Sequence, residues 1–167
     1  DLFRLVLPGE WVGRYRGRKV IEERSDVKTG RLGERTAVIE LEDVQSGQKT
    51  VLDAEYITNM RTGAAGVLGI RYLGKEDVKT LAILGTGRIA RALALCADTA
   101  LGLHMIRATS RTAENRAAFE AALVPRLSCP LQMAESIAPC VDGADAVLAA
   151  VPTPEPILRT LPAGIHV

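Results

Sequence analysis

Residues 85–90, with the sequence GTGRIA, have the G-x-G-x-x-A spacing that binds dinucleotide phosphates where a strand turns into a helix. They follow a short apolar run and open a helical pattern, the context in which this motif is specific. Gly85 allows a tight turn, Gly87 leaves room for the pyrophosphate, and Ala90 keeps helix and strand close. The alternative is an ordinary strand-to-helix turn with incidental glycines. We assign cofactor binding to Gly85, Thr86, Gly87, Arg88 and Ile89.

The segment after the next predicted strand indicates which dinucleotide to expect. In NAD-binding proteins an acidic residue about 20 residues beyond the glycines hydrogen-bonds the ribose 2′-OH. Here Thr109 is followed by Ser110, Arg111 and Thr112, and the first carboxylate comes only at Glu114. A guanidinium and hydroxyls would hold a 2′-phosphate that an acid would repel. Ser110, Arg111 and Thr112 therefore predict NADP as the cofactor, with NAD as the alternative. The competing interpretation of Arg111 is an exposed residue at a helix start.

Alternating strands and helices must position these segments. Strands are expected at 80–84, 104–109, 127–132 and 145–151, and helices at 85–97, 112–123 and 134–141. This alternation predicts the α/β class with a Rossmann-type parallel sheet and right-handed crossovers. The Rossmann strand order makes strand 80–84 central, between 104–109 and 145–151.

The carboxyl end of the last strand leads into a proline-rich loop. Ligands of open α/β sheets bind at the carboxyl ends of the strands, so Val151 and Thr153 are expected beside the nicotinamide. Pro152, Pro154 and Pro156 would stiffen this loop into a wall for the cofactor. The plainer interpretation is a connecting loop.

The N-terminal part is predicted to be rich in strands. Candidates are 2–7, ending at a Pro8-Gly9 turn, then 19–21, 36–41 and 49–52, with a hairpin turn at 45–48 and a loop at 24–35. A helix is then expected from Thr58, as its cap, to about Tyr72. Its glycines at 63, 66 and 69 cost roughly 1 kcal/mol each against Ala, which predicts close packing on another backbone, or else a frayed helix.

Composition narrows the class of protein. The 167 residues include 21 basic and 20 acidic ones, a net charge of +1, so neither nucleic acid nor a membrane surface is an expected partner. The basic run at 14–19 is interpreted as a solvated strand edge. Three scattered cysteines without C-x-x-C spacing predict no metal site and a reducing, cytoplasmic setting. We expect no signal peptide and no membrane span.

With these residues in hand, the chain resembles the ornithine cyclodeaminase and mu-crystallin family from about Lys19 to Val167. The resemblance lies in residues 57–65 (ITNMRTGAA), the motif at 85–90, residues 141–147 (VDGADAV), residues 155–158 (EPIL) and the tail 162–167. It implies a two-domain homodimer. Residues 1–57 would be the β-rich part of a substrate and dimerisation domain, 58–78 a connecting helix, and 79–167 a Rossmann domain incomplete at its C-terminus.

The resemblance also implies site residues. Family members hold the substrate carboxylate with a lysine and an arginine, and Lys19 and Arg61 stand at those positions. A shift of one or two residues would displace Lys19, and Arg61 could instead be a helix-surface residue. The cyclodeaminases carry an acidic catalytic residue beyond the position of Val167, so no catalytic residue is nominated here, and the chain is expected to be a fragment or a shortened protein.

Three activities follow from the resemblance. The first is an NADP-dependent oxidoreductase acting on a small imino or amino acid, of the ketimine reductase or amino-acid dehydrogenase type. The second is a cyclodeaminase with tightly bound NAD and no net redox change. The third is a crystallin-like protein that binds cofactor or ligand without turnover. The residues around Arg111 favour the first.

Overall fold

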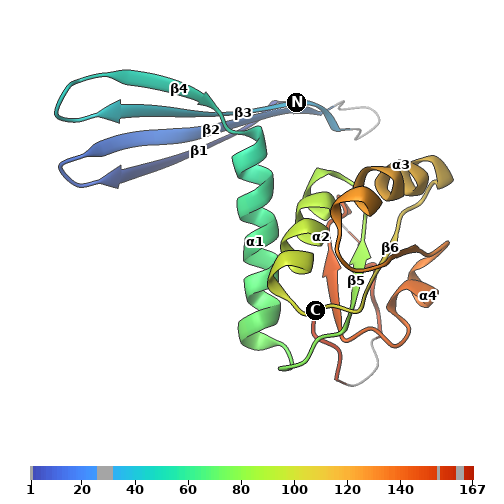
Figure 1. Cartoon of the computed structure of the whole chain (residues 1–167). Helices are drawn as coiled ribbons and strands as arrows, with labels where there is room; N and C mark the ends of the chain where they lie inside the picture. The colour runs from blue at the N-terminus through green and yellow to red at the C-terminus, as the bar shows by residue number, and fades with distance from the viewer. Residues whose placement is uncertain (1, 26–31, 154, 161–163) are drawn as a thin grey trace. The chain divides into compact units, whose positions relative to one another are not determined.

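The computed structural model describes residues 2–25, 32–153, 155–160 and 164–167, and its helices and strands are drawn in Figure 1. Two compact units divide the chain, Asp1–Thr58 and Asn59–Val167. The first contains an antiparallel sheet, and the second contains a parallel sheet with helices. The predicted α/β class is therefore confirmed.

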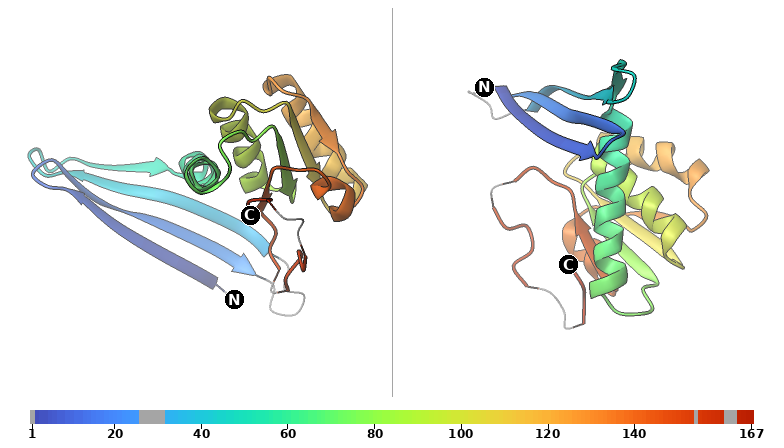
Figure 2. Two further views of the ribbon diagram at one scale, coloured as in Figure 1. Left: turned by 90° about the horizontal axis from the view of Figure 1, so that it is seen from below. Right: turned by 90° about the vertical axis from the view of Figure 1, so that its left-hand side faces the viewer.

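Four antiparallel strands form the sheet of the first unit, in the order β1-β2-β3-β4. They are β1 (Leu2–Trp11), β2 (Tyr15–Ser25), β3 (Leu32–Asp43) and β4 (Lys49–Asp53). Each strand pairs with the next along the chain, as Figure 2 shows. The hairpin turn predicted at 45–48 is confirmed, because Asp43 Oδ1 accepts hydrogen bonds from the backbone N–H groups of Gln45 and Ser46, each at 2.9 Å.

The first strand is longer than predicted. The expected turn at Pro8-Gly9 is wrong, since both residues pair with β2 and the chain turns only at residues 12–14. Pro8 is tolerated because β1 is the edge strand, where a missing N–H need not break a ladder hydrogen bond.

The second and third strands also extend past their predicted ends. The candidate at 19–21 is only the middle of β2, and the loop predicted at 24–35 begins and ends inside strands. Residues 26–31 of that loop lie outside the described residues. Pairing with two neighbours sustains these strands where the local apolar pattern is weak.

One face of this sheet is charged. Directly paired residues point to the same side, and the register sets Arg16 opposite Glu42 and Arg18 opposite Glu40. The corresponding ion pairs measure 3.2 Å and 2.6 Å. Hydrogen bonds from these arginines lower the pKa of both glutamates below the usual range. The basic run is thus divided between the faces, with Lys19 on the opposite side from Arg16 and Arg18.

The other face, which we call the apolar face, carries a row of apolar side chains along β1. By the same register Phe3, Leu5 and Leu7 of β1 share it with Ile21 and Ile39, and Lys19 and Glu23 of β2 lie on it as well. Ile21 is buried, whereas the three β1 side chains are exposed.

Helix α1 (Glu55–Leu73) begins three residues earlier than predicted. Thr58 is not its cap but a fully buried residue inside the first turns. Asp53 Oδ1 instead accepts a hydrogen bond from the Glu55 backbone N–H at 2.8 Å and so caps the start.

The predicted close packing on another backbone is confirmed at Gly63 alone of the three glycines of α1, since Gly66 meets a side chain instead. A Cβ built on Gly63 would lie 2.6 Å from the Ala92 carbonyl carbon, and one on Gly66 would lie 2.6 Å from Leu93 Cδ2. At Gly69 the prediction is wrong, because a Cβ there would meet nothing within 4 Å.

The parallel sheet of the second unit has the order β7-β6-β5-β8. Its strands are β5 (Thr80–Leu84), β6 (Met105–Thr109), β7 (Leu131–Met133) and β8 (Ala146–Ala149). β5 lies between β6 and β8 and pairs in parallel with both, which confirms the predicted central strand. A strand buried on both faces needs a continuous apolar sequence, and LAIL supplies it.

Helices cover both faces of this sheet. Side chains of α1, α2 (Arg88–Ala100) and α3 (Ala113–Leu123) form one core with the β5 and β6 residues that point toward them. A second core, on the other face, joins Ala82, Leu84 and Val147 to α4 (Ile137–Val141). The predicted helix at 134–141 is therefore three residues shorter. The third strand is also shorter and later than predicted, since η1 (Val124–Arg126) precedes it.

Two contacts organise the amino ends of β5 and β8. Asp145 accepts hydrogen bonds from the backbone N–H groups of Lys79 (2.7 Å) and Thr80 (2.8 Å) and pairs with the Lys75 ammonium. On the other side of β8, His166 bridges Ala146 in parallel. Residues 162 and 163 of the tail lie outside the described residues.

Candidate functional site

A pocket of about 980 Å³ lies at the carboxyl ends of the parallel strands. Its lining comprises Leu84, Gly85, Thr86, Gly87, Thr109, Ser110, Arg111, Thr112, Asn115, Glu135, Ser136, Ile137, Ala138, Ala150, Val151, Pro152, Thr153 and Ile157. In open α/β sheets ligands bind in this crevice, at the point where strand order reverses. Here that point is the carboxyl end of β5, with β6 on one side and β8 on the other.

The glycine motif has the geometry of a phosphate cradle. Gly85 has a φ of 110° and passes so close to the Ala150 carbonyl oxygen that a Cβ would collide with it. Gly87 is the N-cap of α2, with no side-chain cap and no acid in the first helical turn. A Cβ on Gly87 would meet nothing within 4 Å. Uncapped N–H groups and open space at a helix start fit a pyrophosphate.

Thr109 fixes the end of β6 at the edge of the pocket. It is buried, and its hydroxyl donates to the Ala134 carbonyl at 2.8 Å. Its own carbonyl accepts the Gly85 N–H at 2.9 Å, which joins this strand end to the glycine motif. The loop that follows therefore starts from a fixed point beside the phosphate cradle.

The loop after Thr109 carries one basic side chain and two hydroxyl groups. Arg111 is exposed, and Thr112 caps α3 by accepting the Asn115 N–H at 3.3 Å. Ser110 Oγ is shielded from solvent and has no hydrogen-bond partner among the described residues. A buried hydroxyl without a partner is costly, so a ligand oxygen at this position would stabilise it. These three side chains are suited to binding an anion such as a ribose phosphate.

The segment after β8 forms the third side of the pocket. The Ala150 N–H donates to the Leu84 carbonyl at 2.8 Å, which holds the start of this segment against β5. Val151, Pro152 and Thr153 follow and are exposed, while Pro154 lies outside the described residues. This side offers apolar surface and a single hydroxyl, which suits a flat ring.

The pocket gathers the predicted cofactor residues from three separate segments. Arg88 and Ile89 are the exceptions, because they stand in the first turn of α2 and are not part of the lining. The sequence reasoning missed Asn115, Glu135, Ser136 and Ile137. The last three follow β7, whose end was predicted to within one residue, so the rule that ligands bind at the carboxyl ends of the strands could have found them.

The two predicted substrate residues occupy different units. Arg61 is exposed on α1 in the second unit, and Lys19 is half-buried on β2 in the first. Lys19 shares its sheet face with its paired residues Leu7 and Ile39, which are apolar.

The cysteines are poor candidates for nucleophiles. Burial raises the pKa of the Cys140 thiol to about 11, and burial together with Asp98 raises that of Cys129 to about 11. Burial also raises the pKa of Cys96. Protonated thiols are weakly reactive, so thiol chemistry is disfavoured at these three positions.

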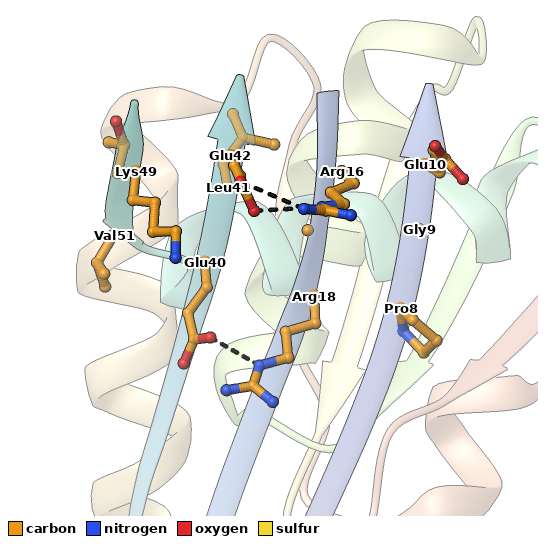
Figure 3. A pocket seen from close by; sticks show the side chains of 12 residues that line it. Pro8, Gly9, Glu10, Arg16, Arg18, Glu40, Leu41, Glu42, Lys49 and Val51 are labelled. Carbon is orange, nitrogen blue, oxygen red and sulfur yellow. Dashed lines mark hydrogen bonds and ion pairs between the residues drawn. The ribbon is translucent and has the colours of Figure 1, made fainter. Parts of the chain in front are cut away.

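A second hollow, of about 670 Å³, lies on the charged face of the antiparallel sheet. Figure 3 shows Arg16 and Arg18 lying toward Glu42 and Glu40 across it. Because Arg16 and Arg18 already pair with these glutamates and are largely exposed, their charges would contribute little to binding a ligand here.

Among the residues that the structure describes, no group of three or more His, Cys, Asp or Glu side chains is placed to hold a metal ion. Within the same residues, the helices are too short or too polar to cross a membrane.

Comparison with known proteins adds sequence and structural relatives. The model of the ornithine cyclodeaminase/mu-crystallin family matches residues 5–167. A Delta(1)-pyrroline-2-carboxylate reductase of Bacillus cereus is 26% identical over 141 residues, covering 82% of this chain and 43% of the relative. An ornithine cyclodeaminase of Agrobacterium fabrum is 28% identical over 123 residues, covering 69% of this chain and 32% of the relative. The chain thus spans less than half the length of these relatives.

The fold is shared with a solved structure. The Thermococcus litoralis Delta(1)-pyrroline-2-carboxylate reductase, in complex with NADH and L-proline, superposes with a TM-score of 0.76 at 21% identity. The match covers 93% of this chain and 53% of that one.

Proposed function

The chain belongs to the ornithine cyclodeaminase/mu-crystallin family, and from this premise we propose that it acts as an NADP-dependent oxidoreductase on a small imino or amino acid. The observation that carries the proposal is the pocket at the carboxyl ends of β5, β6 and β8. It combines a glycine cradle for phosphates with a basic, carboxylate-free loop after β6. The reductase relative and the NADH-bound structural neighbour support the same class of chemistry.

The choice of NADP over NAD rests on the loop after β6. Thr109, Ser110, Arg111 and Thr112 all line the pocket, and none of them is acidic. An exposed guanidinium next to two hydroxyls would bind a 2′-phosphate, whereas a carboxylate would repel it. The structural neighbour was solved with NADH, and the preference for a 2′-phosphate is our proposal for this chain.

The residues of this chain would bind and orient rather than react. The bound nicotinamide supplies hydride transfer. The N–H groups at the start of α2 would hold the pyrophosphate, and Val151 and Thr153 would form the wall beside the nicotinamide. Arg61 would bind the substrate carboxylate through its guanidinium, and Lys19 is a second candidate for binding that group.

A cyclodeaminase activity is the second candidate, favoured by the similarity to the Agrobacterium fabrum ornithine cyclodeaminase. The two candidates differ in their redox balance. A reductase consumes one reduced cofactor for each imine reduced, whereas a cyclodeaminase returns its bound NAD to the starting state in each turnover.

An absorbance assay separates these activities. NADPH and the cyclic imino acid Delta(1)-pyrroline-2-carboxylate are mixed with the protein, and absorbance of the reduced nicotinamide is followed. We expect net loss of absorbance with formation of proline. Ammonia release from ornithine without cofactor consumption would select the cyclodeaminase. Cofactor binding without product in either assay would select a binding protein and overturn the proposed activity.

Arg111 provides the test of cofactor choice. We predict that Arg111→Ala weakens NADPH binding by roughly 1.5–3 kcal/mol, the scale of a hydrogen bond to a charged group, and barely alters NADH binding. Isothermal titration with each cofactor measures this difference. An equal loss for both cofactors would show that Arg111 does not read the 2′-phosphate.

A homodimer is the expected assembly. The apolar face of the antiparallel sheet carries Phe3, Leu5 and Leu7 exposed along β1. Contiguous exposed apolar surface of this kind marks an interaction site, and we propose a second copy of the chain as its partner.

A further inference from the structure

Ser110 and Arg111 form a short loop between β6 and α3, and the backbone of this loop decides where the Arg111 guanidinium can reach. Both residues line the pocket. The ends of the loop are held by Thr109, whose hydroxyl donates to Ala134, and by Thr112, which caps α3. The middle of the loop needs a separate support, because neither anchor touches the Ser110 carbonyl.

Arg116 supplies that support from the second turn of α3. Its Nη1 donates to the Ser110 carbonyl oxygen at 2.7 Å, and the side chain is half-buried. A guanidinium donor makes this hydrogen bond charge-assisted and stronger than one between neutral groups. Arg116 is not part of the pocket lining, so it acts through Ser110 rather than on a ligand.

The position of the Ser110 carbonyl affects both pocket-lining residues of the loop. Fixing this peptide orients both the shielded, unpartnered Ser110 hydroxyl and the next residue, Arg111. A loop that is already ordered loses less conformational freedom when a ligand binds. Contacts made only to a 2′-phosphate would benefit from this order, whereas contacts to the pyrophosphate at Gly87 would not.

We propose that Arg116 is a positioning residue for cofactor specificity: it holds the Ser110–Arg111 loop in the conformation that binds the 2′-phosphate of NADP. This inference rests on the proposed NADP-dependent function. It assigns the preference for NADP to a second arginine that does not touch the cofactor.

The test compares NADPH and NADH binding by titration calorimetry in the wild type, Arg116→Met, Arg116→Lys, Arg111→Ala and Arg91→Met. Methionine keeps an unbranched apolar stem and removes the donors, and lysine keeps a charged donor. Arg91 is the matched control, since its Nη2 donates to the Ala118 carbonyl of α3 at 3.5 Å and it does not line the pocket.

We expect Arg116→Met to reduce the preference for NADPH by about three- to tenfold, the range of one hydrogen bond, and to change NADH affinity by less than about twofold. Arg116→Lys should restore most of the preference, and Arg91→Met should leave it unchanged.

The outcomes distinguish a failure of the Arg116 role from a failure of the proposed preference for NADP. If Arg111→Ala removes the preference for NADPH and Arg116→Met does not, the role of Arg116 is overturned and NADP specificity stands. Equal weakening of both cofactors by Arg116→Met also overturns the positioning role. If the wild type shows no preference for NADPH, the cofactor proposal fails and the role of Arg116 fails with it.

Discussion

Arg61 is exposed on α1, one residue after Met60, whose carbonyl lies 3.8 Å from the thiol of Cys96 on α2. The backbone at this position is therefore held against α2 while the arginine side chain remains accessible. An accessible guanidinium on a well-packed helix can bind a carboxylate without a shift of the backbone.

Replacing Arg61 tests its proposed role in substrate binding. We predict that Arg61→Ala raises the KM for the imino-acid substrate by about tenfold or more, the scale of one lost charged hydrogen bond, with NADPH affinity nearly unchanged. Steady-state kinetics and cofactor titration measure the two quantities. Arg71→Ala, an exposed arginine in the last turn of the same helix, serves as the control. Loss of cofactor binding or of folding in Arg61→Ala would make Arg61 structural.

At the scale of elements, the glycines of α1 divide into two kinds. Gly63 faces the backbone of Ala92 at a distance that leaves no room for a methyl group, so glycine permits the close approach of α1 and α2. Gly69 has open space at the same position and gains nothing from the missing side chain. The same residue type is therefore required at one position and costly at the other.

Two alanine substitutions test this difference. Gly69→Ala should stabilise the protein by about 0.5–1 kcal/mol, because alanine has the higher helix propensity. Gly63→Ala should destabilise it by about 1–3 kcal/mol, since α1 and α2 must move apart. Denaturant unfolding of both variants and the wild type gives the free energies. A stabilising effect of Gly63→Ala would contradict the close packing.

At the scale of the whole molecule, the first unit has little core of its own. Ile21, Ala37 and Ala54 form its buried cluster, with Ile39 packed against it, while β1 is exposed along its full length. A sheet of this kind gains stability when another surface covers its apolar face.

The proposed dimer can be tested on that face. We predict that the wild type sediments as a dimer and that Leu5→Lys shifts it toward monomer, because a charge on the apolar face would have to be buried unpaired. Val6→Lys is the matched control, since the next residue of β1 points to the charged face. Sedimentation velocity at several concentrations measures the shift. Equal effects of both substitutions would argue against an interface on this face.

The amino-acid sequence by itself determined the central place of β5 between β6 and β8 and the position of the glycine motif. The apolar run LAIL, the motif at 85–90 and the Thr112 cap are local signals, readable because each depends on neighbours a few residues away. The same applies to the hairpin turn that follows Asp43.

Only the tertiary structure decided the features that depend on distant partners. Strand β1 continues through Pro8 because it pairs with β2 at the sheet edge, and α1 begins at Glu55 because Asp53 caps it and Thr58 is buried. The support of Ser110 by Arg116 is equally invisible in the sequence, since nothing in its spacing indicates which arginine turns back to a carbonyl. Local pattern specifies which elements form, whereas pairing and burial between segments far apart in the chain set their ends and orient the side chains of the pocket.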